Sequence, residues 1–308
     1  MASPAPQFSG VYVAAVTPHR REGYEADFAA MLELVDFLAK AGVQGICLLG
    51  STGEFLNFKV ADRARLVHLA VKRSRVPIVA GVSHSTLDGA LELAFEAISS
   101  RAAGLLVMPP YFFRYSQPQI KEFYLRFAAE IGTQLPILLY NIPFFTSPIA
   151  IETARELLLT GNFAGIKDSS GDFEYTSELL KIRELQPFSV LVGNDRIYTR
   201  ARQAGADGVV SGVACAIPEL IVALDRAIGR NSPDAIESLE ARLREFIEWI
   251  DRFPTPVAIK IATAARGLKA GPLAVPLPKD ESEKLKEFEN WFKSWVVSVK
   301  NTASRAGA

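Results

Sequence analysis

Short, continuous runs of apolar residues recur along the chain, and each is followed by a segment whose apolar residues return every three or four positions. A continuous run predicts a strand buried on both faces, as in a parallel sheet. The spacing of three or four predicts amphipathic helices, and Gly42 and Gly132 stand where two of them would end. The predicted strands are residues 10–18, 45–50, 77–82, 104–110, 136–143, 163–167, 189–194 and 207–212. The clearest predicted helices are residues 27–42, 60–74, 86–100, 117–132 and 173–185.

The alternation of strands and helices predicts an α/β protein with a parallel sheet. Eight such units in about 220 residues fit a (β/α)8 TIM barrel. The alternative is an open, doubly wound sheet, which often carries a glycine-rich phosphate loop after its first strand. Residues 19–23 read "HRREG" instead, and neither G-x-G-x-x-G nor a P-loop sequence occurs in the chain. The barrel is therefore the favoured fold.

The pattern changes near residue 231, where three helical stretches follow one another without a strand between them. They cover residues 232–253, 256–268 and 279–301. We therefore expect a catalytic barrel at residues 1–230 and a C-terminal three-helix region at residues 231–308. The final stretch, residues 302–308, is expected to be frayed.

Composition and charge restrict the class of partner. The 308 residues are 49% hydrophobic, and 34 Lys and Arg balance 34 Asp and Glu, so the formal net charge is zero. This balance gives no reason to expect a nucleic acid or an acidic membrane as partner. No apolar run reaches the ~20 residues that cross a bilayer, and residues 1–10 do not resemble a secretory signal. We expect a cytoplasmic protein in which Cys47 and Cys215 are buried thiols.

Polar residues gather where the predicted strands end. In a barrel, the carboxyl ends of all strands meet on one face, and chemistry occurs there. The residues that this rule selects are Thr17, Gly50, Ser51, Thr52, Glu54, Tyr111, Tyr140, Asn141, Lys167, Gly193, Asn194, Asp195, Ser211 and Gly212.

Lys167 directly follows a short apolar run, which raises the question of what an amine does there. Burial favours the neutral form of an amine, and a neutral amine can attack a ketone to form a Schiff base. The Ser51 and Thr52 hydroxyls could hold the carboxylate of a 2-oxo acid, and the Tyr140 phenol could transfer protons. Taken singly, Lys167 could be a solvated strand end, and Tyr140 could be a structural hydrogen-bonding group. Their common place at one end of the barrel favours catalysis without a metal or cofactor.

Other candidates have ordinary roles. His19, His68 and His84 do not have metal-ligand spacing, and His68 falls on a helix, so no metal site is predicted. Asp168 and Asp172 are expected at the surface or as helix caps. Thr17 and His84 remain candidates for the rim of the site.

Five motifs resemble those of one family: "GSTGE" (50–54), "YNIP" (140–143), "GIKDSSGD" (165–172), "GND" (193–195) and "TPVAIK" (255–260). The chain resembles the dihydrodipicolinate synthase/N-acetylneuraminate lyase family of pyruvate-dependent class I aldolases. The resemblance implies that Lys167 forms a Schiff base with pyruvate or another 2-oxo acid, that Tyr140 shuttles protons, and that Ser51 and Thr52 hold the carboxylate. The substrate-binding set is Gly50, Ser51, Thr52, Phe145, Gly193, Asp195, Val210 and Ser211. The family resemblance also implies a homotetramer built as a dimer of dimers. In that assembly, a loop with Tyr111 and Phe112 reaches across an interface.

Two positions depart from the synthase pattern. Phe145 stands where the synthases have an arginine for the second substrate's carboxylate, and Phe112 stands where they have a relay tyrosine. Synthase-type condensation is therefore disfavoured, and a lyase or aldolase for a 2-keto-3-deoxy sugar acid, with an aldehyde as second reactant, is favoured. Arg196 and Arg114 could contact an acidic sugar, although Arg196 could equally be a solvated first helical turn. The alternatives are a dehydratase that uses the same imine and a non-catalytic sugar-acid-binding barrel.

Overall fold

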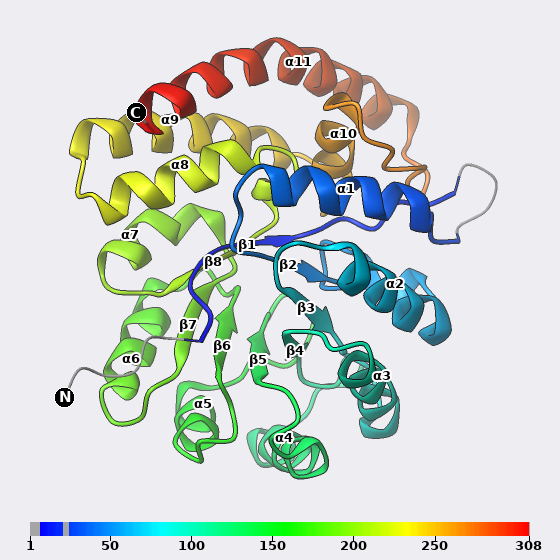
Figure 1. The fold of residues 1–308 in the computed structure, drawn as a ribbon, viewed down its shortest axis with the longest axis vertical. Helices are drawn as coiled ribbons and strands as arrows, with labels where there is room; N and C mark the ends of the chain where they lie inside the picture. The colour runs from blue at the N-terminus through cyan, green and yellow to red at the C-terminus, as the bar shows by residue number, and fades with distance from the viewer. Residues whose placement is uncertain (1–6, 21–24, 308) are drawn as a thin grey trace.

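Eight parallel strands close into a barrel in chain order, and β8 pairs with β1 (Figure 1). The computed structural model describes residues 7–20 and 25–307. The predicted (β/α)8 barrel is confirmed, and the open sheet is wrong. The strands are β1 (Gly10–Ala14), β2 (Gly45–Leu48), β3 (Ile78–Gly81), β4 (Gly104–Val107), β5 (Ile137–Asn141), β6 (Gly165–Asp168), β7 (Ser189–Val192) and β8 (Gly208–Ser211).

The strands are shorter than the apolar runs that predicted them. The run at residues 10–18 contains β1 only at Gly10–Ala14, yet Ala15 and Val16 beyond it remain buried. An apolar run reports burial, whereas a strand needs a partner ladder, so the two end at different residues. Every residue of the eight strands is buried, as expected of a parallel sheet covered on both faces.

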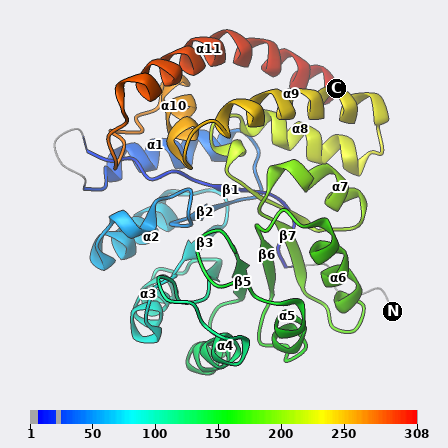
Figure 2. The ribbon, with the colours of Figure 1, turned by 180° about the vertical axis from the view of Figure 1, so that it is seen from behind.

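Helices surround the barrel on its outer side (Figures 1 and 2). The predicted end of the first helix is confirmed by Gly42, which has φ of +82°, and that of the fourth by Gly132 at φ of +58°. Both values lie in the left-handed region that favours glycine after a helix. The helices are α1 (Phe28–Lys40), α2 (Val60–Arg73), α3 (Leu87–Ser99), α4 (Gln117–Ile131), α5 (Ile151–Leu158), α6 (Phe173–Arg183), α7 (Tyr198–Gln203) and α8 (Pro218–Gly229).

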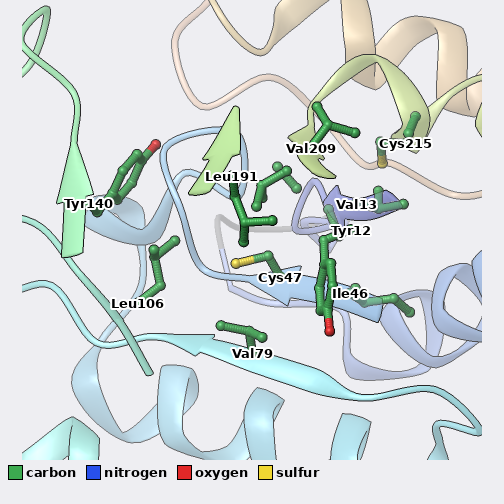
Figure 3. Packing of buried hydrophobic residues seen from close by; sticks show 14 of the residues in the cluster. Tyr12, Val13, Ile46, Cys47, Val79, Leu106, Tyr140, Leu191, Val209 and Cys215 are labelled. Carbon is green, nitrogen blue, oxygen red and sulfur yellow. The ribbon is translucent and has the colours of Figure 1, made fainter. Parts of the chain in front are cut away.

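Apolar side chains fill the interior of the barrel. Figure 3 shows Cys47, Leu106 and Leu191 turned into the space that the strands enclose, with Tyr140 beside them. All four are at most 3% exposed. These side chains form a close-packed apolar floor beneath the carboxyl ends of the strands. A polar side chain that lies above this floor needs neighbouring groups to stabilise it.

Three further helices follow the barrel, α9 (Pro233–Ile250), α10 (Val257–Ala265) and α11 (Lys279–Gly307). Helices α9 and α11 lie beside α8 on one side of the barrel (Figures 1 and 2). Aromatic rings join them: Phe246 of α9 stacks on Trp295 of α11 at 5.5 Å between ring centroids. The division of the chain at residue 230 stays a prediction.

The expected fraying of the C-terminus is wrong for the described residues, because α11 continues to Gly307. Ala303 is buried, and the Thr302 hydroxyl donates to the carbonyl of Ser298, so packing and local hydrogen bonding extend the helix. Polar and small residues suggested a loose tail, but tertiary contacts decide helix length.

Two composition-based expectations can be compared with the structure. Cys47 and Cys215 are buried free thiols, as predicted. In the part of the chain that the structure describes, no helix has the length and apolar character needed to cross a membrane. The interpretation of residues 1–10 as lacking a signal rests mainly on residues 1–6, which lie outside the described ranges. The cytoplasmic location stays a prediction.

Candidate active site

A cavity of about 650 Å³ opens at the carboxyl ends of the strands. The structure brings together most of the residues that the strand-end rule and the motifs selected. Gly50 and Ser211 lie outside its lining: Gly50 belongs to the turn before Ser51, and the Ser211 hydroxyl accepts a hydrogen bond from the amide of Ala214. The predicted residues in the lining are Ser51, Thr52, Tyr140, Phe145, Lys167, Gly193, Asn194, Asp195, Val210 and Gly212.

Lys167 and Tyr140 face each other on neighbouring strands. The pairing of β5 with β6 places the two residues in register, so their side chains leave the sheet on the same side. The Lys167 Nζ atom lies 4.2 Å from the centroid of the Tyr140 ring, and only 3% of Lys167 is exposed. The face of an aromatic ring attracts a cation, so Tyr140 compensates part of the cost of enclosing an ammonium group.

Tyr140 also contacts the turn after β2. Its phenol oxygen lies 3.0 Å from the Ser51 hydroxyl, and either atom can be the donor. A buried hydrogen bond stabilises the same turn, since the Thr17 hydroxyl donates to the carbonyl of Gly53 at 2.7 Å. Thr17, a candidate for the rim, is thus a buried support for the turn. A proton can pass between the Tyr140 and Ser51 hydroxyls across their contact.

Gly193 leaves room for the lysine side chain. A Cβ atom at this position would lie 2.8 Å from Cε of Lys167 and 2.0 Å from the hydroxyl oxygen of Ser169. Any larger residue would displace one of these two groups. Ser169 lines the cavity and was missed by sequence reasoning. It stands two residues after Lys167, on the same side of an extended chain, and this spacing could have revealed it.

Asp195 brings a carboxylate to the cavity. Its Oδ1 atom is buried and has no hydrogen-bond partner among the described residues. Burial raises its pKa from 3.8 to about 6, while hydrogen bonds from Ser211 and the amide of Val213 and the charge of Lys167 act in the opposite direction. An unsatisfied buried oxygen at a cavity is a ready acceptor for a substrate hydroxyl.

The expectation that Asp168 is a surface or capping residue is wrong. Asp168 is 2% exposed and accepts hydrogen bonds from Asn141 Nδ2 at 2.7 Å and from the Ser170 hydroxyl at 2.7 Å. Burial raises its pKa and these hydrogen bonds lower it. Alternation along β6 turns it to the opposite face from Lys167, where it ties β6 to β5. Asp172 does cap α6, since its side chain accepts from the amide of Glu174.

The basic candidates have protein partners. Arg196 lines the cavity but forms an ion pair with Asp251, and each side chain is about half exposed. It lies in a short 3-10 turn, Asp195–Ile197, so the interpretation as a solvated turn residue fits better than that of a cation reserved for an acidic sugar. Arg114 lies outside the cavity lining, and its Nη1 donates to the carbonyl of Thr146 at 2.6 Å. His84, outside the lining, is hydrogen-bonded with Thr86.

A second cavity of about 830 Å³ adjoins the first, and Ser51 and Phe145 line both. Tyr111 and Phe112 line only the second one. Phe112 is 88% exposed and has φ of +83°, and Phe145 is 56% exposed. Within residues 7–20 and 25–307, no group of three or more His, Cys, Asp or Glu side chains is placed to hold a metal ion.

Comparisons with known proteins place the chain among relatives of one family. The profile of the dihydrodipicolinate synthetase family matches residues 7–294. The chain is 31% identical to the 4-hydroxy-tetrahydrodipicolinate synthase of Alkaliphilus oremlandii over 296 residues, 94% of this chain and 100% of that protein. The crystal structure of dihydrodipicolinate synthase from Aquifex aeolicus superposes with a TM-score of 0.87 at 27% identity, covering 94% and 98% of the two chains. A 2-keto 3-deoxygluconate aldolase from Picrophilus torridus gives 0.81 at 25% identity, covering 88% and 99%.

The raised pKa of Asp195 makes stability depend on pH. The folded protein holds this proton more tightly than the unfolded chain, so the resulting stabilisation is full below pH 3.8 and lost as pH rises through about 6. The Asp195→Asn variant cannot ionise at this position, so its unfolding free energy lacks this decrease with rising pH. Between pH 4 and 7, the wild type should lose about 2 kcal/mol of unfolding free energy relative to the variant. Urea denaturation of both proteins at several pH values measures the difference, and parallel pH profiles would contradict the assignment.

Proposed function

The chain belongs to the dihydrodipicolinate synthetase family, and we propose that it is a lyase whose Lys167 forms an imine with pyruvate or a larger 2-oxo acid. The observation that carries the proposal is the placement of the Lys167 amine over Tyr140, whose phenol contacts Ser51. A nearly buried amine beside a proton-transfer group is the arrangement that Schiff-base catalysis needs.

The chemistry follows from the imine. The neutral Lys167 nitrogen attacks C2 of the 2-oxo acid, and the carbonyl oxygen leaves as water. In the cleavage direction, the hydroxyl on C4 loses its proton, the C3–C4 bond breaks, and its electron pair moves into the iminium to give an enamine. The aldehyde leaves, C3 takes up a proton, and water then releases pyruvate and the free amine. Tyr140 transfers these protons, with Ser51 as its hydrogen-bonded partner.

The substrate carboxylate binds at the turn after β2. Ser51 and Thr52 line the cavity next to Tyr140, and their hydroxyls and the nearby backbone amides are suitable donors for an anion. This position orients C2 of the 2-oxo acid toward Lys167. Gly193 keeps the space above the amine open on the other side.

The remaining part of the cavity favours a hydroxylated partner, such as a 2-keto-3-deoxy sugar acid. Asp195 offers an unsatisfied acceptor, and the Arg196–Asp251 pair offers both a donor and an acceptor. Similarity to the 2-keto 3-deoxygluconate aldolase supports this class. Phe145 offers no charge to a second carboxylate, which disfavours synthase-type condensation despite the names of several relatives. Dehydration of the same acid shares the first imine and is the alternative reaction.

The proposed enzyme is a homotetramer. Phe112 and Phe113 form an edge-to-face pair with ring centroids 5.0 Å apart, and both are mostly exposed, as is Phe144. Exposed aromatic side chains gathered near a cavity are typical of an interface between subunits. The loop with Tyr111 and Phe112 is thus assigned to a subunit contact.

Borohydride reduction in the presence of pyruvate tests the imine. Intact mass should increase by one reduced pyruvate adduct, and peptide mapping should place it on Lys167, with no adduct in Lys167→Met. A panel of 2-keto-3-deoxy acids, assayed separately for pyruvate release and for water loss, distinguishes aldol cleavage from dehydration. Absence of an adduct with every 2-oxo acid tried would favour the non-catalytic binding barrel.

Replacing Tyr140 tests the proton transfer. Tyr140→Phe keeps the ring over Lys167 but removes the hydroxyl, so kcat should fall by about 10²-fold or more. Tyr198→Phe is the matched control, because Tyr198 is also buried and hydrogen-bonded, to Asp225, but lies outside the cavity lining. Steady-state kinetics of both variants provide the comparison. Equal kcat losses would exclude a specific role for the Tyr140 hydroxyl.

A further inference from the structure

A buried ion pair joins the C-terminal helices to the turn that carries Ser51 and Thr52. Lys260 of α10 is 1% exposed, and its Nζ donates to Glu54 Oε2 at 2.6 Å. It also lies 2.9 Å from His19 Nδ1 and 3.5 Å from the carbonyl oxygen of Pro272. The three acceptors match the three N–H bonds of an ammonium group. A charged Lys260 has no lone pair, so His19 Nδ1 is the acceptor in this contact.

The partners of Lys260 come from three separate segments. His19 follows the first strand, Glu54 ends the "GSTGE" turn, and Pro272 belongs to the connection between α10 and α11. Glu54 has φ of +50°, a backbone conformation that a non-glycine residue holds only when its surroundings fix it. The ion pair with Lys260 is one contact that holds it, and the Thr17 bond to the carbonyl of Gly53 is a second.

We propose that Lys260 is a positioning residue for the 2-oxo-acid carboxylate, acting through Glu54 on the turn that carries Ser51 and Thr52. The inference rests on the proposed function of that turn. Lys260 lines the neighbouring 830 Å³ cavity rather than the one with Lys167, so it does not touch the reacting atoms. Its loss leaves Lys167 and Tyr140 on their strands but releases the carboxylate donors. Affinity for pyruvate therefore suffers more than the capacity of Lys167 to form the imine.

Arg266 provides a matched control at the end of the same helix. It is a nearly buried cation that pairs with Glu219 at 2.6 Å and donates to the carbonyl of Ala216 at 2.6 Å. These contacts tie α10 to α8 and to the segment after β8, away from the "GSTGE" turn. Arg266→Met and Lys260→Met both remove a buried cation, so a general loss of stability would appear in both.

The experiment measures borohydride-trapped adduct against pyruvate concentration in the full-length protein. Lys260→Met should raise the half-saturating pyruvate concentration by about 10-fold, as expected for a slight misplacement of binding groups, with the adduct still on Lys167 at saturation. Arg266→Met should bind pyruvate like the wild type. The double variant Glu54→Gln/Lys260→Met removes both charges of the pair, so no unpaired buried charge destabilises the fold. Pyruvate binding can therefore be measured even if a single variant fails to fold. Its effect should be smaller than the product of the two single effects, because both residues act through one contact.

Each outcome has one meaning. If the wild type forms no adduct with pyruvate or any larger 2-oxo acid, the proposed function fails, and the positioning role fails with it. If the wild type forms the adduct and Lys260→Met has a wild-type half-saturation, only the positioning role is overturned. The same holds if Arg266→Met weakens pyruvate binding equally, or if the effects of Glu54→Gln and Lys260→Met multiply independently.

Discussion

The arrangement depends on one constraint, the enclosure of a lysine amine above a packed apolar floor. Burying a charge is costly unless other groups compensate. Here, Tyr140 presents its ring face 4.2 Å from Nζ, and Gly193 lacks the side chain that would collide with Lys167. The imine chemistry that we propose needs the amine held in this enclosed place. Packing at the end of β6 and the proposed reactivity therefore depend on the same contacts.

The surroundings of the amine are fixed from both faces of the barrel wall. On the inner face, the β5–β6 register sets Tyr140 beside Lys167. On the outer face, Asn141 and Asp168 bond to each other at 2.7 Å and join the same two strands. A closed sheet allows little sliding between neighbours, so a hydrogen bond outside the barrel maintains an alignment inside it.

Sequence reasoning succeeded where the information is local. Continuous apolar runs predicted the barrel, and the strand-end rule selected Lys167, Tyr140 and Ser51, which lie together in the structure. It failed where burial depends on a distant partner. Asp168 was misread because its partner, Asn141, lies on another strand. The Arg196–Asp251 and Lys260–Glu54 pairs join residues 55 and 206 positions apart, and no periodicity in one sequence relates such positions.

The most direct measurement is a crystal structure of the protein grown or soaked with pyruvate. The account predicts continuous electron density from Lys167 Nζ to C2 of pyruvate. The pyruvate carboxylate should lie within hydrogen-bond distance of Ser51 and Thr52, with the Tyr140 hydroxyl beside the new bond. Pyruvate bound without a link to Lys167, linked to another lysine, or with its carboxylate away from the turn after β2 would contradict the account.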